Sequence, residues 1–223
     1  MKSFDLITSP VFDVVKASDK FENPTKRVNE MWQTDFTYFK IIGWGWYYLG
    51  TVLDDYSRYI IAWDLCTTMA ATDAKATVDK ALLMTGLDRT NAPKLLSDNG
   101  PCYIAKDLKE YFDEIGIKHI HGAPMHPQTQ GKIERYHRSM KNVVKLENYY
   151  TPDHLRKALT EFVRYYNNQR YHESLKNVTP SDVFFGRHER ILQQREQTKR
   201  RTIEARRKSY FETKSLLKAV SSN

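Results

Sequence analysis

Cysteine is scarce in this sequence, since only Cys66 and Cys102 occur among its 223 residues. The two do not form a CxxC motif, and no group of His and Cys has the spacing of a zinc site. Such a low cysteine count is typical of a protein from a reducing compartment, and we expect both thiols to be buried or inert. This pattern excludes the disulfide-rich secreted class and the zinc-finger class.

Long apolar runs are also missing. No stretch approaches the ~18 consecutive apolar residues of a membrane span. The start of the chain lacks the basic and apolar regions of a secretory signal. We therefore expect a cytoplasmic protein without a membrane partner. The sequence contains no internal repeat either, which excludes the solenoid architectures.

Acidic residues are few in the last part of the chain, residues 187–223. This segment contains eleven Lys or Arg and four Glu, and it accounts for +7 of the net charge of +8. Residues 1–186 are nearly neutral, at +1. The distribution favours an anionic partner that contacts the end of the chain. We predict that residues 187–223 form an exposed helix or a partly disordered arm.

Alternating apolar residues indicate strands in the first half of the sequence. Three such runs, at 32–42, 46–53 and 58–65, are joined by short turn-like links, which predicts an antiparallel meander. Later segments alternate between helical and strand patterns. The remaining predicted elements are a helix at 74–84 capped by Thr72, a strand at 94–97, a helix at 105–115, a strand at 117–121, and helices at 131–148, 154–169, from Thr179 and at 189–218.

This element order predicts an α/β fold. Three antiparallel strands followed by helix, strand, helix, strand and helix are the order of the ribonuclease H-like fold. We expect a five-stranded mixed sheet flanked by helices, in which the first strand is central and the fourth is its parallel neighbour, with a C-terminal helical extension. The predicted parts are an arm at 1–30 with one short helix, a core at 31–186 and the basic tail at 187–223.

Three carboxylates stand where packing does not require an acid. Asp98 follows the short strand at 94–97 and precedes an Asn-Gly-Pro turn, while Glu134 lies near a helix start. Asp35 interrupts an alternating strand, where Asp is unfavourable. Each alone has an ordinary explanation, as a turn residue, a solvated helix residue or a polar residue at a strand edge.

Together the three acids predict a metal site. Mg²⁺ prefers oxygen ligands, and Mn²⁺ can substitute for it. Two such ions about 4 Å apart activate an attacking oxygen and stabilise a leaving one in phosphodiester displacement. We therefore predict that Asp35, Asp98 and Glu134 are both the metal ligands and the catalytic residues. None of the seven His has a spacing to carboxylates that indicates a metal ligand.

Four segments carry a resemblance to a known family. They are WQTDFTY at 32–38, LDDYSR at 53–58, SDNG at 97–100 and HPQTQGKIER at 126–135. They resemble the catalytic core of retroviral integrases and of the bacterial insertion-sequence transposases that share it. The 35 residues between Asp98 and Glu134 match the interval of that group. The segment 166–175, with Thr179 and Pro180, resembles the bacterial members more closely.

The resemblance implies a transposase that nicks DNA at the 3′ ends of an element and joins each freed 3′-OH to another phosphodiester. It implies a homo-oligomer on double-stranded DNA, at element ends and target, and a bacterial, nucleoid-associated location. Many such transposases recognise their ends with an N-terminal helix-turn-helix. Only about thirty residues precede the first strand here. A separate helix-turn-helix polypeptide, a truncated chain and binding by the basic tail are the three explanations left open.

Basic residues near the acids predict phosphate contacts. On a helix that begins near Gln130, Glu134, Arg138 and Lys141 share one face. The ordinary alternative, a surface pair of Arg138 with Glu134, is worth only about 0.5 kcal/mol and leaves Lys141 unexplained. Two basic clusters in the tail begin seven residues apart and would lie on roughly one side of a helix. The predicted DNA contacts are Lys132, Arg138, Lys141, Lys199, Arg200, Arg201, Arg206, Arg207 and Lys208.

Two other functions remain open. One is a ribonuclease H-like nuclease that only hydrolyses, although the 35-residue interval and the HPQTQG segment argue against it. The other is a catalytically idle remnant that binds DNA or a partner and regulates transposition. Asp54 and Asp55 form a further acidic pair at a strand end. We interpret this pair as turn residues, with Tyr56 and Arg58 supporting the hairpin.

Overall fold

The computed structural model describes residues 24–122 and 130–220. The short helix expected in the first thirty residues falls mainly outside these ranges. Most of the HPQTQG segment, 126–131, also lies outside them. The sheet, the helices and the three predicted acids all lie within them.

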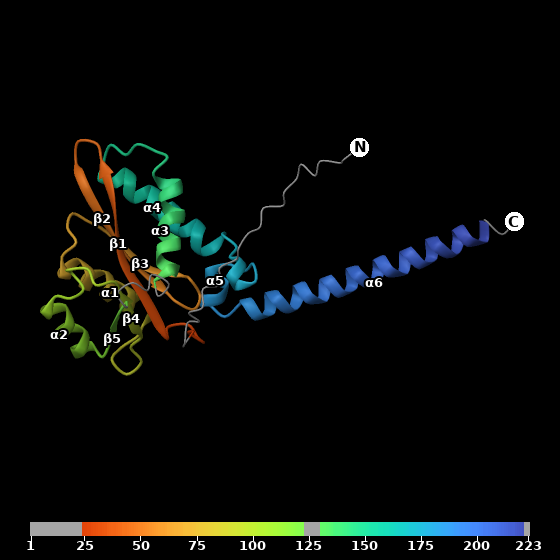
Figure 1. Ribbon diagram of the computed structural model, residues 1–223, viewed down its shortest axis with the longest axis horizontal. Helices are drawn as coiled ribbons and strands as arrows, with labels where there is room; N and C mark the ends of the chain where they lie inside the picture. Colours follow the sequence, from red (N-terminus) through yellow and green to blue (C-terminus); the bar gives the residue numbers. More distant parts are fainter. Residues whose placement is uncertain (1–23, 123–129, 221–223) are drawn as a thin grey trace, which may run out of the picture.

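Five strands form one mixed sheet in the order β3–β2–β1–β4–β5 (Figure 1). β1 pairs antiparallel with β2 and parallel with β4, and β4 pairs parallel with β5. The predicted sheet, with its central first strand and its parallel fourth strand, is therefore confirmed. The strands are β1 (Met31–Ile41), β2 (Gly45–Asp54), β3 (Ile60–Cys66), β4 (Lys94–Ser97) and β5 (Lys118–His121).

Helices cover both faces of the sheet. On one face α1 (Ala71–Thr85) and α2 (Lys106–Ile115) enclose a core that includes Trp32 of β1. On the other face α3 (Gly131–Val144) and α4 (Pro152–Asn168) pack on Phe39 and Ile41 of the same strand. Successive β1 side chains point to opposite faces, so this one strand contributes to both cores.

Two predicted helix boundaries were wrong. α1 begins at Ala71, so Thr72 lies inside it; the cap is Ala70, whose N–H donates to the Asp73 carboxylate at 3.0 Å. An acid at the third helical position thus satisfies the N-terminus without a capping hydroxyl. α3 ends at Val144, about four residues early, where the Tyr149 hydroxyl donates to the Val144 carbonyl at 2.6 Å. This bond satisfies one of the last helical carbonyls.

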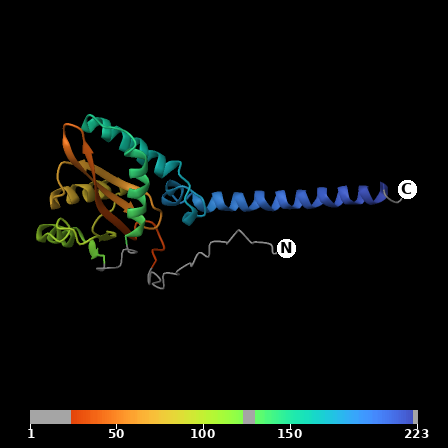
Figure 2. The same ribbon diagram turned by 45° about the horizontal axis from the view of Figure 1, so that its top comes forward.

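The last described segment of the chain is a single long helix. After a 3₁₀ turn (Glu173–Leu175) and the short α5 (Pro180–Phe184), α6 (His188–Val220) projects away from the sheet (Figures 1 and 2). Of the two predicted states for this segment, residues 188–220 adopt the helical one. Near its base Arg195 donates to the Asn177 carbonyl at 2.7 Å. In the described ranges, no helix has the length and apolarity that crossing a membrane requires.

Candidate active site

Asp35 lies in the middle of β1 and faces α3. Its Oδ2 atom lies 3.3 Å from Nδ1 of His137, a side chain that is almost completely buried. His137 comes from the second turn of α3, three residues after Glu134. His137 was not among the predicted site residues, although its spacing from Glu134 places both on one helix face. The contact connects the central strand to the helix that carries the third acid.

Glu134 is exposed in the first turn of α3 and lines the same hollow as Asp35. This hollow has a volume of about 380 Å³. Arg138 and Lys141 line it too, so the predicted shared face of Glu134, Arg138 and Lys141 is confirmed. The acid and the two cations open onto one space, in which a negatively charged ligand would meet both cations.

Asp98 directly follows β4, where the sequence placed it. Its Oδ1 atom accepts a hydrogen bond from the Gly100 N–H at 2.9 Å, as a turn residue does. Ser97 donates to the Asp98 carbonyl at 2.8 Å, and His119 lies 2.8 Å from the same Ser97 hydroxyl. The backbone at the end of β4 is thereby fixed, while the Asp98 side chain is exposed.

Asp35 and Asp98 both follow the segments of β1 and β4 that pair with each other. The last pair is Gln33 with Leu96, so each acid comes two residues after it, with Asp98 just beyond the end of β4. Burial, followed by the nearby Asp98 carboxylate, raises the pKa of Cys102 to about 11, and Asp35 acts in the same direction. Both acids therefore lie close enough to one thiol to affect its ionisation.

The three acids do not yet form one cluster. Among residues 24–122 and 130–220, no group of three or more His, Cys, Asp or Glu side chains is arranged to hold a metal ion. Asp35 and Glu134 share the hollow, whereas Asp98 is not part of its lining. Carboxylate oxygens suit Mg²⁺, so the donor set fits a divalent ion in its chemistry. The assignment of the three acids as ligands stays a prediction.

Asp54 and Asp55 are both fully buried, and they have different partners. Asp54 accepts hydrogen bonds from the backbone N–H and the hydroxyl of Ser57 and from the Asn29 N–H. These bonds confirm that it is a turn residue. Burial raises the pKa of Asp54, while the two bonds from Ser57 oppose this effect.

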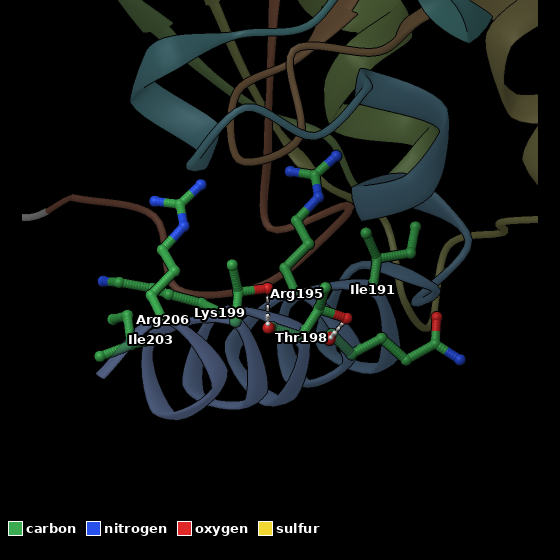
Figure 3. Close-up of a pocket in the computed structure, with 8 residues that line it drawn as sticks. Ile191, Arg195, Thr198, Lys199, Ile203 and Arg206 are labelled. Carbon is green, nitrogen blue, oxygen red and sulfur yellow. Dashed lines mark hydrogen bonds between the residues drawn. The ribbon is translucent and has the colours of Figure 1, made fainter. Parts of the chain in front are cut away.

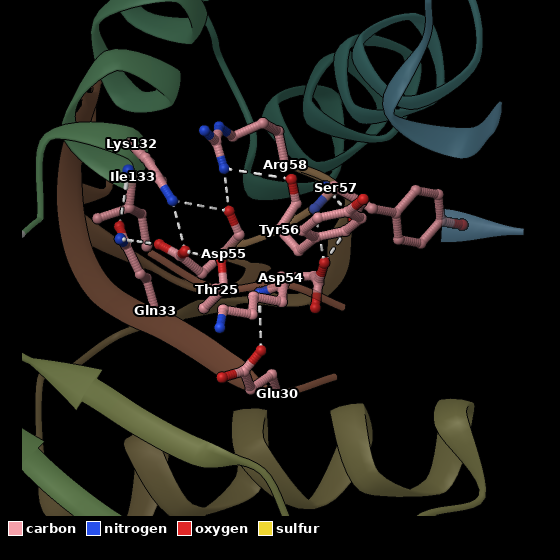
Figure 4. A network of polar contacts seen from close by, with 12 residues as sticks. Thr25, Glu30, Gln33, Asp54, Asp55, Tyr56, Ser57, Arg58, Lys132 and Ile133 are labelled. Carbon is pink, nitrogen blue, oxygen red and sulfur yellow. Dashed lines mark hydrogen bonds and ion pairs between the residues drawn. The ribbon is translucent and has the colours of Figure 1, made fainter. Parts of the chain in front are cut away.

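Asp55 connects the end of β2 to α3 (Figure 4). Its carboxylate forms an ion pair with Lys132 and accepts a hydrogen bond from the Gln33 amide at 2.7 Å. The side-chain oxygen Oε1 of Gln33 accepts a hydrogen bond from the Ile133 N–H at 3.0 Å. Gln33 lies two residues before Asp35, and Ile133 directly precedes Glu134. The Asp55 network therefore fixes the start of α3 against β1.

The predicted DNA contact Lys132 has this structural partner. Its ammonium group also donates to the Asp55 backbone carbonyl at 3.0 Å. Burial lowers the pKa of Lys132, with a further contribution from Arg58, and Asp55 opposes both. The geometry thus gives Lys132 a role within the fold, and its contact with DNA stays a prediction.

The predicted basic contacts in α6 are all exposed, on a helix that projects away from the sheet. Lys199 and Arg206 line one hollow of about 690 Å³ along the helix (Figure 3). Arg200 pairs with Glu196 at 3.2 Å and Lys208 with Glu212 at 3.9 Å, both at the surface. Such pairs contribute about 0.5 kcal/mol or less, so these cations keep most of their capacity for an anionic ligand.

Comparison with known proteins shows which families this chain resembles. Residues 25–127 match a family described as "Integrase core domain", and residues 115–180 match a second family with the same description. The Gag-Pro-Pol polyprotein of squirrel monkey retrovirus is 34% identical over 116 residues, which are 52% of this chain and 6% of that protein. The corresponding polyprotein of Mason-Pfizer monkey virus is 32% identical over 117 residues, with the same coverage. Residues 25–180 are therefore similar to integrase core domains, and the relatives named here are retroviral.

Solved structures establish the fold. The HTLV-2 integrase catalytic core domain in complex with magnesium aligns with a TM-score of 0.57 at 20% identity, covering 71% of this chain and 97% of that one. A simian T-cell lymphotropic virus intasome aligns with a TM-score of 0.61 at 20% identity, covering 73% and 56%. The fold is that of integrase catalytic cores, the predicted ribonuclease H-like fold. This chain matches only 6% of the length of the retroviral polyproteins.

Proposed function

We propose that this protein is a polynucleotidyl transferase that cleaves DNA and joins a freed 3′-OH to another phosphodiester. The observation that carries the proposal is the placement of Asp35, Asp98 and Glu134 on an integrase core. Asp35 and Asp98 each come two residues after the last β1–β4 pair, and Asp35 shares a hollow with Glu134. A site of carboxylates on this fold suits phosphodiester displacement without a covalent enzyme intermediate.

The three carboxylates would hold divalent cations. The magnesium named with the HTLV-2 core supports Mg²⁺ here, and we extend the proposal to two ions and to substitution by Mn²⁺. When bound, such ions supply charge stabilisation for the phosphoryl oxygens. Residues of the chain itself do the remaining work. His137 orients Asp35, while Arg138 and Lys141 bind phosphates at the hollow.

The finer identity that we propose is an insertion-sequence transposase of a bacterial cytoplasm, associated with the nucleoid. Segment 166–175 with its following Thr-Pro supports this reading. The duplex of element ends and target would be its DNA partner. The HTLV-2 core is described in trimeric and dimeric forms, which supports a homo-oligomer. A separate helix-turn-helix polypeptide is one candidate source of end recognition, beside the basic tail.

A strand-transfer assay tests the proposed function. The protein is incubated with Mg²⁺, pre-nicked element ends and a target duplex, and the products are separated by length. Joined products are the expected result. Cut but unjoined products would indicate a nuclease that only hydrolyses. Binding without either product would indicate a catalytically idle remnant.

The tail should contribute most of the sequence-independent affinity for duplex DNA. Each phosphate contact contributes about −0.9 to the slope of log affinity against log salt. A double variant, Lys199→Gln with Arg206→Gln, should therefore reduce the magnitude of this slope by about 1.8. Lys106→Gln is the control, because Lys106 forms an exposed surface pair with Glu110 on α2. Equal slopes for the double variant and the wild type would show that α6 serves another purpose, such as subunit contacts.

A further inference from the structure

The outer half of the β1–β2 hairpin exposes large aromatic side chains. Tyr38, Trp44 and Trp46 are 49%, 58% and 51% exposed. Ile42, at the end of the same hairpin, is 58% exposed. Clustered apolar exposure of this kind marks an interaction site more often than scattered single residues do.

This surface is exposed because no described helix covers this part of the sheet. In an antiparallel pair, opposite residues point to the same face, and the register sets Lys40 opposite Trp46 and Tyr38 opposite Tyr48. Phe39 and Ile41 point to the other face and are buried under α3 and α4. α1 covers the Tyr38 side of the sheet only nearer its base, where Thr77 approaches Gly50.

Lysines surround the exposed rings. The Lys40 ammonium lies 5.9 Å from the centroid of the Trp46 ring. Those of Lys141 and Lys145 lie 4.9 Å and 5.9 Å from the centroid of Tyr38. Tyr38 and Trp46 themselves meet edge to face, with centroids 5.4 Å apart. The surface thus combines flat apolar rings with positive charge from two separate elements.

This surface is continuous with the candidate active site. Tyr38 and Lys141 line the hollow that also contains Asp35 and Glu134. A ligand bound on the rings would therefore extend directly to the acids. Burial, followed by the neighbouring Lys145, lowers the pKa of Lys141, which indicates two cations held close together.

We propose that Tyr38, Lys40, Trp46, Lys141 and Lys145 form an aromatic–lysine platform that binds unpaired nucleotides of a DNA strand. Bases stack on the rings and phosphates contact the lysines, the combination that binds single strands in other proteins. The platform deepens the proposed function and rests on it, because the DNA strand bound there would lead into the hollow of Asp35 and Glu134. It adds a substrate class, a DNA end with unpaired bases.

Charge favours a nucleic acid over a second copy of this chain. In a two-fold contact the same patch of both subunits meets itself. The three lysines would then face the three lysines of the partner, and like charges in contact disfavour association. An anionic strand instead compensates all three cations. Its bases also cover the rings, which a purely phosphate-binding surface would leave exposed.

The test measures binding of a short oligothymidylate and of a duplex to the full chain without divalent metal. Trp46→Ala should weaken single-strand binding about tenfold, because stacking on an aromatic ring contributes ~1–3 kcal/mol per base. Duplex binding should change little, because paired bases do not offer their faces. Trp46→Phe should retain most of the affinity, since a ring remains. Tyr171→Ala is the control, because Tyr171 is also 63% exposed and the centroid of its ring lies 5.7 Å from Arg195 at the base of α6, not on the hairpin.

Three results would overturn the platform. These are equal single-strand affinities of Trp46→Ala and the wild type, equal losses for single strand and duplex, and an equal loss in Tyr171→Ala. Because the binding assay uses no metal and no joining step, it is independent of catalysis. A selective loss in Trp46→Ala supports the platform even where strand transfer fails, and that failure counts against the proposed function alone.

Discussion

Replacing Asp98 with Asn should abolish DNA joining while leaving the fold intact. The Asn side chain keeps an Oδ1 acceptor for the Gly100 N–H, so the turn after β4 persists. It loses the negative charge that a divalent ion requires. If charge stabilisation by the ions contributes about 4 kcal/mol, joining should fall about a thousandfold. Strand-transfer rates and thermal unfolding curves of both proteins measure the two effects.

Metal-dependent stability provides a second readout of the same variant. Mg²⁺ at about 100 times its dissociation constant should stabilise the wild-type fold by about 2.7 kcal/mol, and Asp98→Asn should lose this increment. Asp88→Asn is a matched control, because Asp88 is also an exposed turn acid, accepting the Thr90 N–H at 2.8 Å. A fully active Asp98→Asn protein would remove the central assignment.

Replacing Asp55 with Ala should destabilise the fold strongly. Asp55 is fully buried and Lys132 is 23% exposed, so the variant leaves a largely buried cation without its compensating carboxylate. Removing one partner of a buried pair costs about 3 kcal/mol. For a chain of this size, that lowers Tm by roughly 10 °C. Calorimetric or circular-dichroism melting of the full chain measures the change.

An exposed acid in the same sheet provides the comparison. Asp64 pairs with Arg156 at 3.2 Å, and both side chains are more than a third exposed. Asp64→Ala should change stability by less than about 1 kcal/mol. If the Asp55→Ala and Asp64→Ala variants had the same melting temperature, the Asp55 network would not stabilise the start of α3.

The sheet could be predicted because its signals are local. The alternating runs and turn residues between 32 and 65 fixed three strands, and the apolar segment before the Asn-Gly-Pro turn fixed the position of Asp98. The predictions of helix ends were less accurate. Asp73 rather than Thr72 satisfies the start of α1, and a tyrosine beyond α3 stabilises its early end.

The contacts around the acids could not be read from local patterns. The pairing of Asp35 with His137 and the connection from Gln33 through Asp55 to Lys132 join residues far apart in the sequence. They form only when β1, β2 and α3 meet. A single sequence offers charged residues at these positions without indicating which of them face each other.

The geometry of α6 sets a length scale for the DNA. Its 33 residues extend about 50 Å at ~1.5 Å per residue. At about 3.4 Å per base pair, this equals roughly fifteen base pairs, or about one and a half turns of duplex. If the helix keeps its direction on binding, a duplex shorter than this cannot reach both the hollow at Glu134 and the far end of the arm. The length of the duplex would then determine how many cations of α6 contact DNA phosphates.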